Sequence, residues 1–155
     1  MKNIILIFSV IFLVGCSDES VNIDSQSIDK KETFNWRLVT SWPKNYPGLG
    51  MAPERIADLV EEMSDGQMKI TVYGAEEQVP AFGVFDAVSS GSHQMGHSGG
   101  YFWKGKVPAA QFFTSVPFGL TADEINAWVN RGGGLELWRE IYAPFNIYPI
   151  PAGNT

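Results

Sequence analysis

Two kinds of hydrophobic periodicity alternate along the chain, and this alternation constrains the fold more than any other feature. Residues 34–40 (FNWRLVT) and 68–73 (MKITVY) place aromatic or branched apolar side chains at every second position, which predicts two strands. Between them, Pro53 suits a helix start, apolar residues recur at spacings of three and four, and Gly66 is expected to end the helix. The segment therefore predicts a strand, a helix and a second strand, with Phe34, Trp36 and Leu38 on one face of the first strand.

The same alternation continues through a third strand. A helix is expected over about 80–90, ended by Gly91, followed by a short strand over about 94–97. Strands that alternate with helices in this way favour right-handed βαβ units on a parallel sheet, with the ligand crevice at the carboxyl ends of the strands. The loops predicted to hold the site are 41–50, 74–79 and 98–106.

The last third of the chain is predicted to be mostly helical. Thr121 and Glu124 form a capping-box pattern that opens a helix. Gly132–Gly134 should interrupt it before a second helical piece that runs to about Tyr142. An extended segment over 146–151 follows.

The first 33 residues read as an export signal and a linker. Lys2 precedes an apolar run over 4–14, which is too short to cross a bilayer, and Gly15 stands before Cys16. We expect a lipoprotein signal peptide over 1–15, with lipid attached to Cys16; an ordinary secretory signal is the alternative. Residues 16–33 are polar, acidic and without apolar periodicity, which predicts a disordered tether.

Charge and cysteine content exclude several functional classes. The net charge is −6 and no run of basic residues exists, which argues against binding to a nucleic-acid backbone. Cys16 is the single cysteine, so the chain cannot form an internal disulfide or a site built from several cysteines.

Motifs for catalysis or metal binding are incomplete. Gly96–Gly100 matches Gly-x-Ser-x-Gly, the pattern of a serine hydrolase elbow around Ser98, but both histidines precede the serine and no helix follows directly. The stretch 100–106 resembles a phosphate-binding loop that lacks its Ser or Thr. His93 and His97 lie on a predicted strand, where residues four apart are about 13 Å from each other, too far to share a metal ion.

Aromatic residues outside the regular elements are more informative. Such side chains line small-molecule clefts, where rings exclude water and a hydroxyl or indole N–H orients the ligand. For Trp42 and Tyr101, at strand ends, we favour a role in the site. For Phe112, Phe113 and Phe118, packing as additional core is equally plausible.

A series of ordered motifs resembles the extracytoplasmic solute-binding proteins of TRAP transporters. The resemblance extends from Phe34 to the end of the chain and is closest to the branch that binds 2-oxo acids such as pyruvate. The motifs are TSWP (40–43), VFDAV (84–88), GH (96–97), YFWKGK (101–106), PAAQFF (108–113), VPFGL (116–120), GGGLELW (132–138) and PAGNT (151–155).

The resemblance implies an α/β fold: one lobe of a periplasmic-binding-protein clamshell of type II, with a mixed, mostly parallel sheet flanked by helices. Family members are about twice as long, so 34–155 would be the first lobe, truncated at the crossover to a missing second lobe. The arginine that pairs with the ligand carboxylate, and the residues that hold a metal ion in this branch, would follow Thr155. The first lobe would contribute Tyr101, Trp103, Trp42 and Asn154 to the ligand site.

We therefore expect an exported, periplasmic, lipid-anchored binding component rather than an enzyme. It would capture a small carboxylate, with a 2-oxo acid preferred, for TRAP permease subunits and sodium-coupled uptake. No cofactor is expected in this chain, while sodium and a homodimer are open for a full-length protein. The alternatives are an exported serine hydrolase that uses Ser98 and an anchored sensor or interaction domain with no role in transport.

Overall fold

The computed structural model describes residues 31–114 and 116–153. The predicted signal peptide, Cys16 and Asn154 lie outside the described residues, as does the predicted tether apart from residues 31–33, which belong to no helix or strand. The described residues belong to one compact unit.

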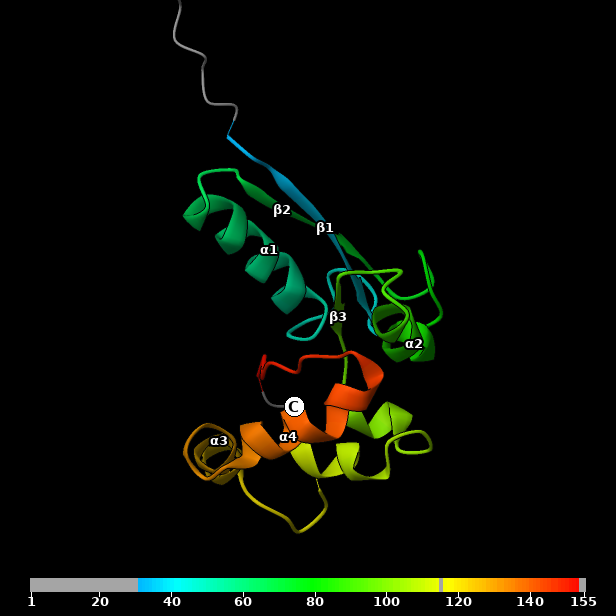
Figure 1. Cartoon of the computed structure of the whole chain (residues 1–155), viewed down its shortest axis with the longest axis vertical. Coiled ribbons are helices and arrows are strands. Elements are labelled where there is room, and N and C mark those ends of the chain that lie inside the picture. The colour runs from blue at the N-terminus through cyan, green and yellow to red at the C-terminus, as the bar shows by residue number, and fades with distance from the viewer. Residues whose placement is uncertain (1–30, 115, 154–155) are drawn as a thin grey trace, which may run out of the picture. The chain divides into compact units, whose positions relative to one another are not determined.

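The described strands form one parallel sheet (Figure 1). β1 (Phe34–Thr40) lies in the centre, with β2 (Met68–Tyr73) on one side and β3 (Met95–His97) on the other. β1 pairs with β2 along six residues and with β3 along three, from Leu38 opposite Met95 to Thr40 opposite His97. The expected α/β class with a mostly parallel sheet is confirmed, and these three strands pair only in parallel.

One helix covers each face of the sheet at the carboxyl half of β1. Successive side chains of a strand point to opposite faces, and here Leu38 packs with Ala57 of α1 (Met51–Met63) whereas Val39 packs with Val84 of α2 (Val84–Ser89). Both faces are therefore buried at this end. At the other end Phe34 and Trp36 remain 48% and 39% exposed, so of the three residues predicted to share one face, Leu38 is the one that is buried.

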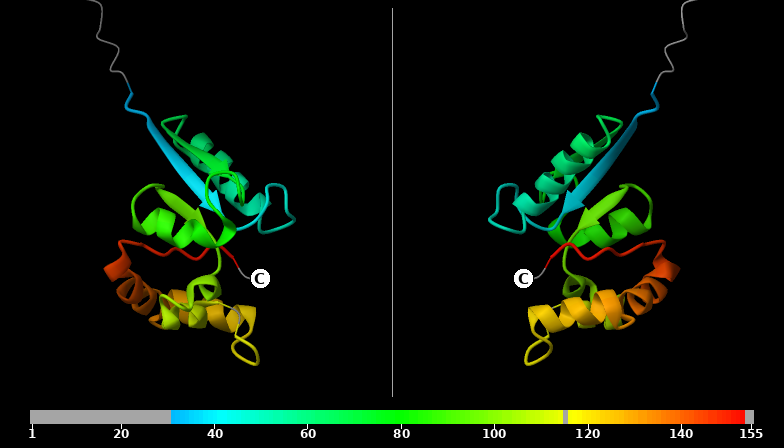
Figure 2. Two further views of the ribbon diagram at one scale, coloured as in Figure 1. Left: turned by 90° about the vertical axis from the view of Figure 1, so that its right-hand side faces the viewer. Right: turned by 90° about the vertical axis from the view of Figure 1, so that its left-hand side faces the viewer.

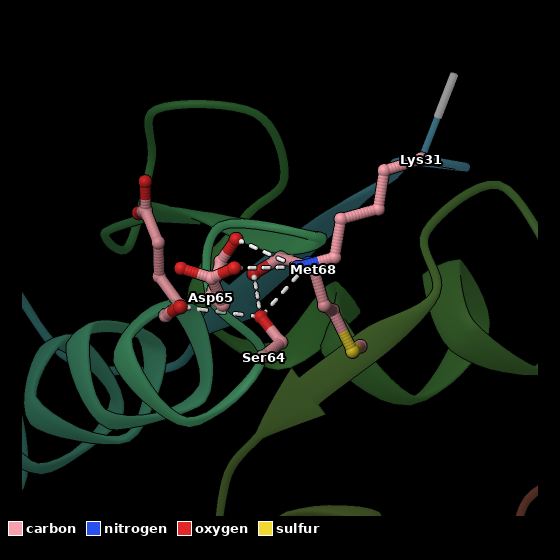
Figure 3. Close-up of polar contacts among 5 residues, drawn as sticks. Lys31, Ser64, Asp65 and Met68 are labelled. Carbon is pink, nitrogen blue, oxygen red and sulfur yellow. Dashed lines mark hydrogen bonds and ion pairs between the residues drawn. The ribbon is translucent and has the colours of Figure 1, made fainter. Parts of the chain in front are cut away.

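A short turn connects α1 to β2 (Figure 3). The Ser64 hydroxyl accepts a hydrogen bond from the Met68 amide at 3.0 Å. Asp65 and Gly66 both have positive φ, which is the left-handed geometry that ends a helix. The exposed Asp65 carboxylate lies 2.6 Å from the Lys31 ammonium, and this hydrogen bond holds the pKa of Asp65 below its ordinary value. Gly66 thus serves as the helix stop that the sequence predicted.

The predicted helix over about 80–90 is a composite. A 3₁₀ turn, Ala81–Gly83, leads directly into α2, and Gly91 follows with φ of 75°. The predicted third strand is present over 95–97.

Beyond the carboxyl ends of β1 and β3 the chain becomes helical (Figures 1 and 2). Two 3₁₀ segments, η2 (Gly100–Trp103) and η3 (Pro108–Phe113), precede α3 (Ala122–Arg131) and α4 (Gly134–Tyr142). The capping box at Thr121 is formed as predicted. The segment 146–151 belongs to no strand and passes between the sheet and these helices in both side views.

A group of aromatic rings connects α2 to the helical part. We call Phe85, Trp103, Trp138, Tyr142 and Phe145 the aromatic core. Phe85 is 4% exposed, and its ring centroid lies 5.3 Å from that of Trp103 and 6.0 Å from that of Tyr142. Large apolar surfaces buried in this way dominate the stability of a small domain. Neither Phe85 nor Tyr142 was identified as core from the sequence.

Phe112, Phe113 and Phe118, for which a role in the core and a role in the site were both open, differ in burial. Phe113 is buried and stacks between Trp128 and Trp138, at 5.3 Å from each ring, so it is additional core. Phe112 is 57% exposed and Phe118 is fully exposed, so the core interpretation is wrong for both.

Of the residues described, none belongs to a helix long and apolar enough to span a membrane.

Candidate functional site

A cleft of about 700 Å³ opens at the carboxyl ends of β1 and β3. The strand order β2-β1-β3 means that the chain leaves β1 toward one side and later crosses to the other, so a crevice is expected between β1 and β3. Most of the lining comes from the loop after β1, the stretch after β3, α3 and the C-terminal segment, with further residues from α1, from the end of η3 and the loop that follows it, and from α4. The lining residues used below are Trp42, His97, Ser98, Gly99, Tyr101 and Trp103.

Two of the three predicted loops line this cleft, and the third does not. Residues from 41–50 and 98–106 contribute to it, whereas none from 74–79 does. The prediction for 74–79 is wrong because β2 is the outer strand, separated from β3 by β1. That loop instead packs on the loop after β1: the Ala75 amide donates to the Trp42 carbonyl at 2.9 Å.

A group of aromatic side chains lies beside the cleft. We call Trp42, Phe82, His97, Tyr101 and Phe102 the cleft aromatics; Trp42, His97 and Tyr101 line the cleft itself, and Phe82 and Phe102 pack against them. Phe102 is their centre, with ring centroids at 4.6 Å from Tyr101, 5.0 Å from Phe82 and 6.2 Å from Trp42. Trp42 also lies 5.0 Å from the His97 ring. Trp42 and Tyr101, both predicted for the ligand site, thus lie in the lining of one cleft, and their contact with a ligand stays a prediction.

Trp103 also lines the cleft, but its polar edge points into the protein. Its indole N–H donates to the Tyr142 hydroxyl at 2.5 Å. Tyr142 is 2% exposed, and burial raises the pKa of its hydroxyl, against the opposing effect of the bond from Trp103. Trp103 therefore offers the cleft its ring and not a free hydrogen-bond donor.

Among the described residues that line the cleft, none carries a formal charge at neutral pH. His97 is the histidine of this lining, and burial lowers the pKa of its imidazole, which favours the uncharged form. Its Nδ1 is buried without a hydrogen-bond partner in the described part of the chain. The Arg139 guanidinium lies over the Tyr148 ring, 4.4 Å from its centroid, and Arg139 is not part of the lining. An anionic ligand would therefore meet rings and neutral polar groups on this wall.

The geometry around Ser98 does not favour a hydrolase. Its hydroxyl lies 2.5 Å from the Ser41 hydroxyl, and Ser41 in turn donates to the Ala81 carbonyl at 2.7 Å. A nucleophilic serine needs an imidazole within hydrogen-bond reach, and His93 directs its Nδ1 to Ser92 at 3.1 Å instead. The turn after Ser98 is a 3₁₀ segment rather than the long helix of a nucleophile elbow.

Sequence reasoning missed part of the lining. Ile125, Asn126 and Val129 of α3 border the cleft, as do residues 150–153. The capping box predicted where α3 begins, but it did not indicate which face of the helix borders the cleft. Asn154, the fourth predicted site residue, lies outside the described residues.

The family of the chain follows from its sequence. Residues 38–150 match the DctP family, described as bacterial extracellular solute-binding protein, family 7. The chain belongs to this family, and thus to a family of binding proteins and not of enzymes.

Its relatives of known structure are TRAP periplasmic solute-binding proteins. One from Pseudoalteromonas atlantica, with bound sodium and pyruvate, is 46% identical with a TM-score of 0.75. It covers 77% of this chain, which spans 36% of that protein. Another from Colwellia psychrerythraea, with bound calcium and pyruvate, is 42% identical with a TM-score of 0.75, and the shares are 77% and 37%.

A third relative has a described ligand class. A monocarboxylate 2-oxoacid-binding periplasmic protein from Nostoc is 48% identical over 143 residues, which are 92% of this chain and 38% of the relative. The present chain therefore spans little more than a third of the length of the relatives that it matches.

Proposed function

We propose that the full-length protein is the solute-binding component of a TRAP transporter and captures a 2-oxo acid such as pyruvate. The observation that carries the proposal is the cleft at the β1 and β3 ends, lined by Trp42, Tyr101 and Trp103, in a chain 46% identical to a pyruvate-bound protein. Residues 34–155 would form the first lobe. The permease subunits would then receive the ligand for sodium-coupled uptake.

The uncharged lining supports different contributions of the two lobes to ligand binding. A carboxylate taken from water needs a compensating charge or several hydrogen-bond donors, and the described lining offers no cationic side chain. We infer that the counter-charge comes from outside the described residues, while this lobe supplies apolar enclosure. Asn154 would add an amide to the same wall.

A cation is proposed for the full-length protein and not for the described lobe. The relatives with pyruvate hold sodium or calcium. Within residues 31–114 and 116–153 no group of three or more His, Cys, Asp or Glu side chains is placed to hold a metal ion. The described residues do not fit such a site, and nothing in the proposed role of this lobe depends on one.

Calorimetric titration of the full-length protein with pyruvate tests the function. We expect saturable binding, weakened at least tenfold by Tyr101→Ala because the ring that encloses the ligand is lost. Arg131→Ala, on the exposed end of α3 away from the cleft lining, is the matched control and should bind like the wild type. Absence of binding to pyruvate and to longer 2-oxo acids would contradict the proposal.

We propose that the protein is exported and anchored to a membrane by lipid on Cys16. The support is the short apolar run that ends at Gly15-Cys16. Incorporation of a labelled fatty acid in cells, lost in Cys16→Ser, is the expected result; equal labelling of the variant would exclude the anchor. A homodimer of the full-length protein stays a prediction, to be checked by its mass in solution.

A further inference from the structure

The ring of Tyr101 is folded back over Gly99. A Cβ atom built on Gly99 would lie 2.7 Å from two carbons of the Tyr101 ring and 3.0 Å from its hydroxyl oxygen. Real Cβ contacts are never that short, because van der Waals repulsion rises steeply below about 3.5 Å. The position taken by the Tyr101 ring is therefore available only while residue 99 has no side chain.

The backbone of Gly99 does not itself require glycine. Its φ of −105° and ψ of 134° lie in the extended region, which every residue adopts without strain. The three nearest atoms that an added methyl group would meet all belong to Tyr101. Glycine at this position thus serves the tyrosine ring and not the turn.

Gly100, the next residue, has to be glycine because another segment of main chain lies against it. A Cβ there would lie 2.5 Å from the Ala110 carbonyl oxygen, which is main chain in a buried segment and has no room to move. The two adjacent glycines therefore have separable roles: Gly100 allows η2 and η3 to approach each other, and Gly99 allows the far end of the Tyr101 ring to lie close to the main chain.

The contacts of Tyr101 explain why its placement matters to the cleft. The ring meets Phe102 edge-on at 4.6 Å and borders the cleft together with Gly99. A methyl group at residue 99 would push the ring away from this wall, and rotation about χ1 moves a tyrosine hydroxyl by several ångströms.

We propose that Gly99 is a positioning residue of the ligand site, which acts through Tyr101 by holding its ring against the cleft wall. The inference rests on the proposed function as far as ligand affinity is concerned. The ring placement itself does not depend on that function. The two parts are therefore tested by separate measurements on the same proteins.

The experiment is a double-mutant cycle in the full-length protein, with Gly99→Ala, Tyr101→Ala and both together. Pyruvate affinity is measured by calorimetry. We expect Gly99→Ala to weaken binding about tenfold, which corresponds to about 1.4 kcal/mol, and to add less than about twofold in the Tyr101→Ala background. Equal losses in both backgrounds, or no loss in the wild-type background, would overturn the proposal.

The second measurement needs no ligand. In protein labelled in its tyrosine rings, Gly99→Ala should shift the Tyr101 resonances, identified by their loss in Tyr101→Ala. Gly105→Ala is the matched control, because an added Cβ there meets no atom within 4 Å and its backbone is unstrained. Unchanged Tyr101 resonances in Gly99→Ala would refute the positioning role. If even the wild type fails to bind pyruvate, the proposed function fails, and the resonances still decide the role of Gly99.

Discussion

Tyr101 and Trp103 lie two residues apart in the same 3₁₀ segment and both line the cleft, yet their rings pack in different aromatic groups. Tyr101 is one of the cleft aromatics, half-buried, with a ring that packs on Phe102 and on the bare backbone of Gly99. Trp103 is part of the aromatic core, where Phe85 and the Tyr142 hydroxyl hold it. This division follows from what surrounds each ring: a buried hydrogen bond and the aromatic core hold Trp103, whereas ring packing beside the cleft holds Tyr101.

The largest effect that would test this division is expected from Tyr142. Tyr142→Ala removes a ring that is 2% exposed and should lower the free energy of unfolding by about 3–5 kcal/mol, the usual cost of an aromatic deletion in a core. Tyr142→Phe keeps the ring but leaves the Trp103 N–H without its partner, and should cost about 1–3 kcal/mol. Urea unfolding of the full-length protein, followed by circular dichroism, measures both.

Equal stability of wild type and Tyr142→Phe would show that the Trp103 N–H finds another acceptor. The division between the two aromatic groups would then rest on packing alone.

A smaller effect on stability is expected at Tyr101. Tyr101→Ala truncates a half-buried side chain whose main contact is the Phe102 ring, so its cost should be about 1 kcal/mol. The same urea experiment measures it, with Phe118→Ala as the control because that side chain is fully exposed. A loss as large as that of Tyr142→Ala would place Tyr101 in the core and remove the contrast.

The parts of the fold that could be predicted from the sequence are those that a local pattern specifies. β1 and β2 have the expected bounds because alternation is a property of consecutive residues. The stop at Gly66 and the capping box at Thr121 are local for the same reason. The 3₁₀ segments η2 and η3 were not predicted, since their geometry depends on packing against α4 and α2 and not on periodicity.

The cleft lining was predictable to a similar degree. Trp42 and Tyr101 could be expected in one cleft because loops at the carboxyl ends of parallel strands converge. The loop 74–79 was assigned wrongly because strand order is set by long-range pairing. The partner of Trp103 is 39 residues away on α4, so no spacing in the sequence indicated that its indole N–H is already engaged.

The paired hydroxyls of Ser41 and Ser98 fix the direction in which their protons point. The Ser41 hydroxyl has one proton, and it donates this proton in a hydrogen bond to the Ala81 carbonyl, which can only accept. The contact between the two hydroxyls then requires Ser98 to donate, so its own proton is directed away from the cleft. What remains on the cleft side of Ser98 is an oxygen lone pair, and a ligand atom that meets it must bring its own hydrogen.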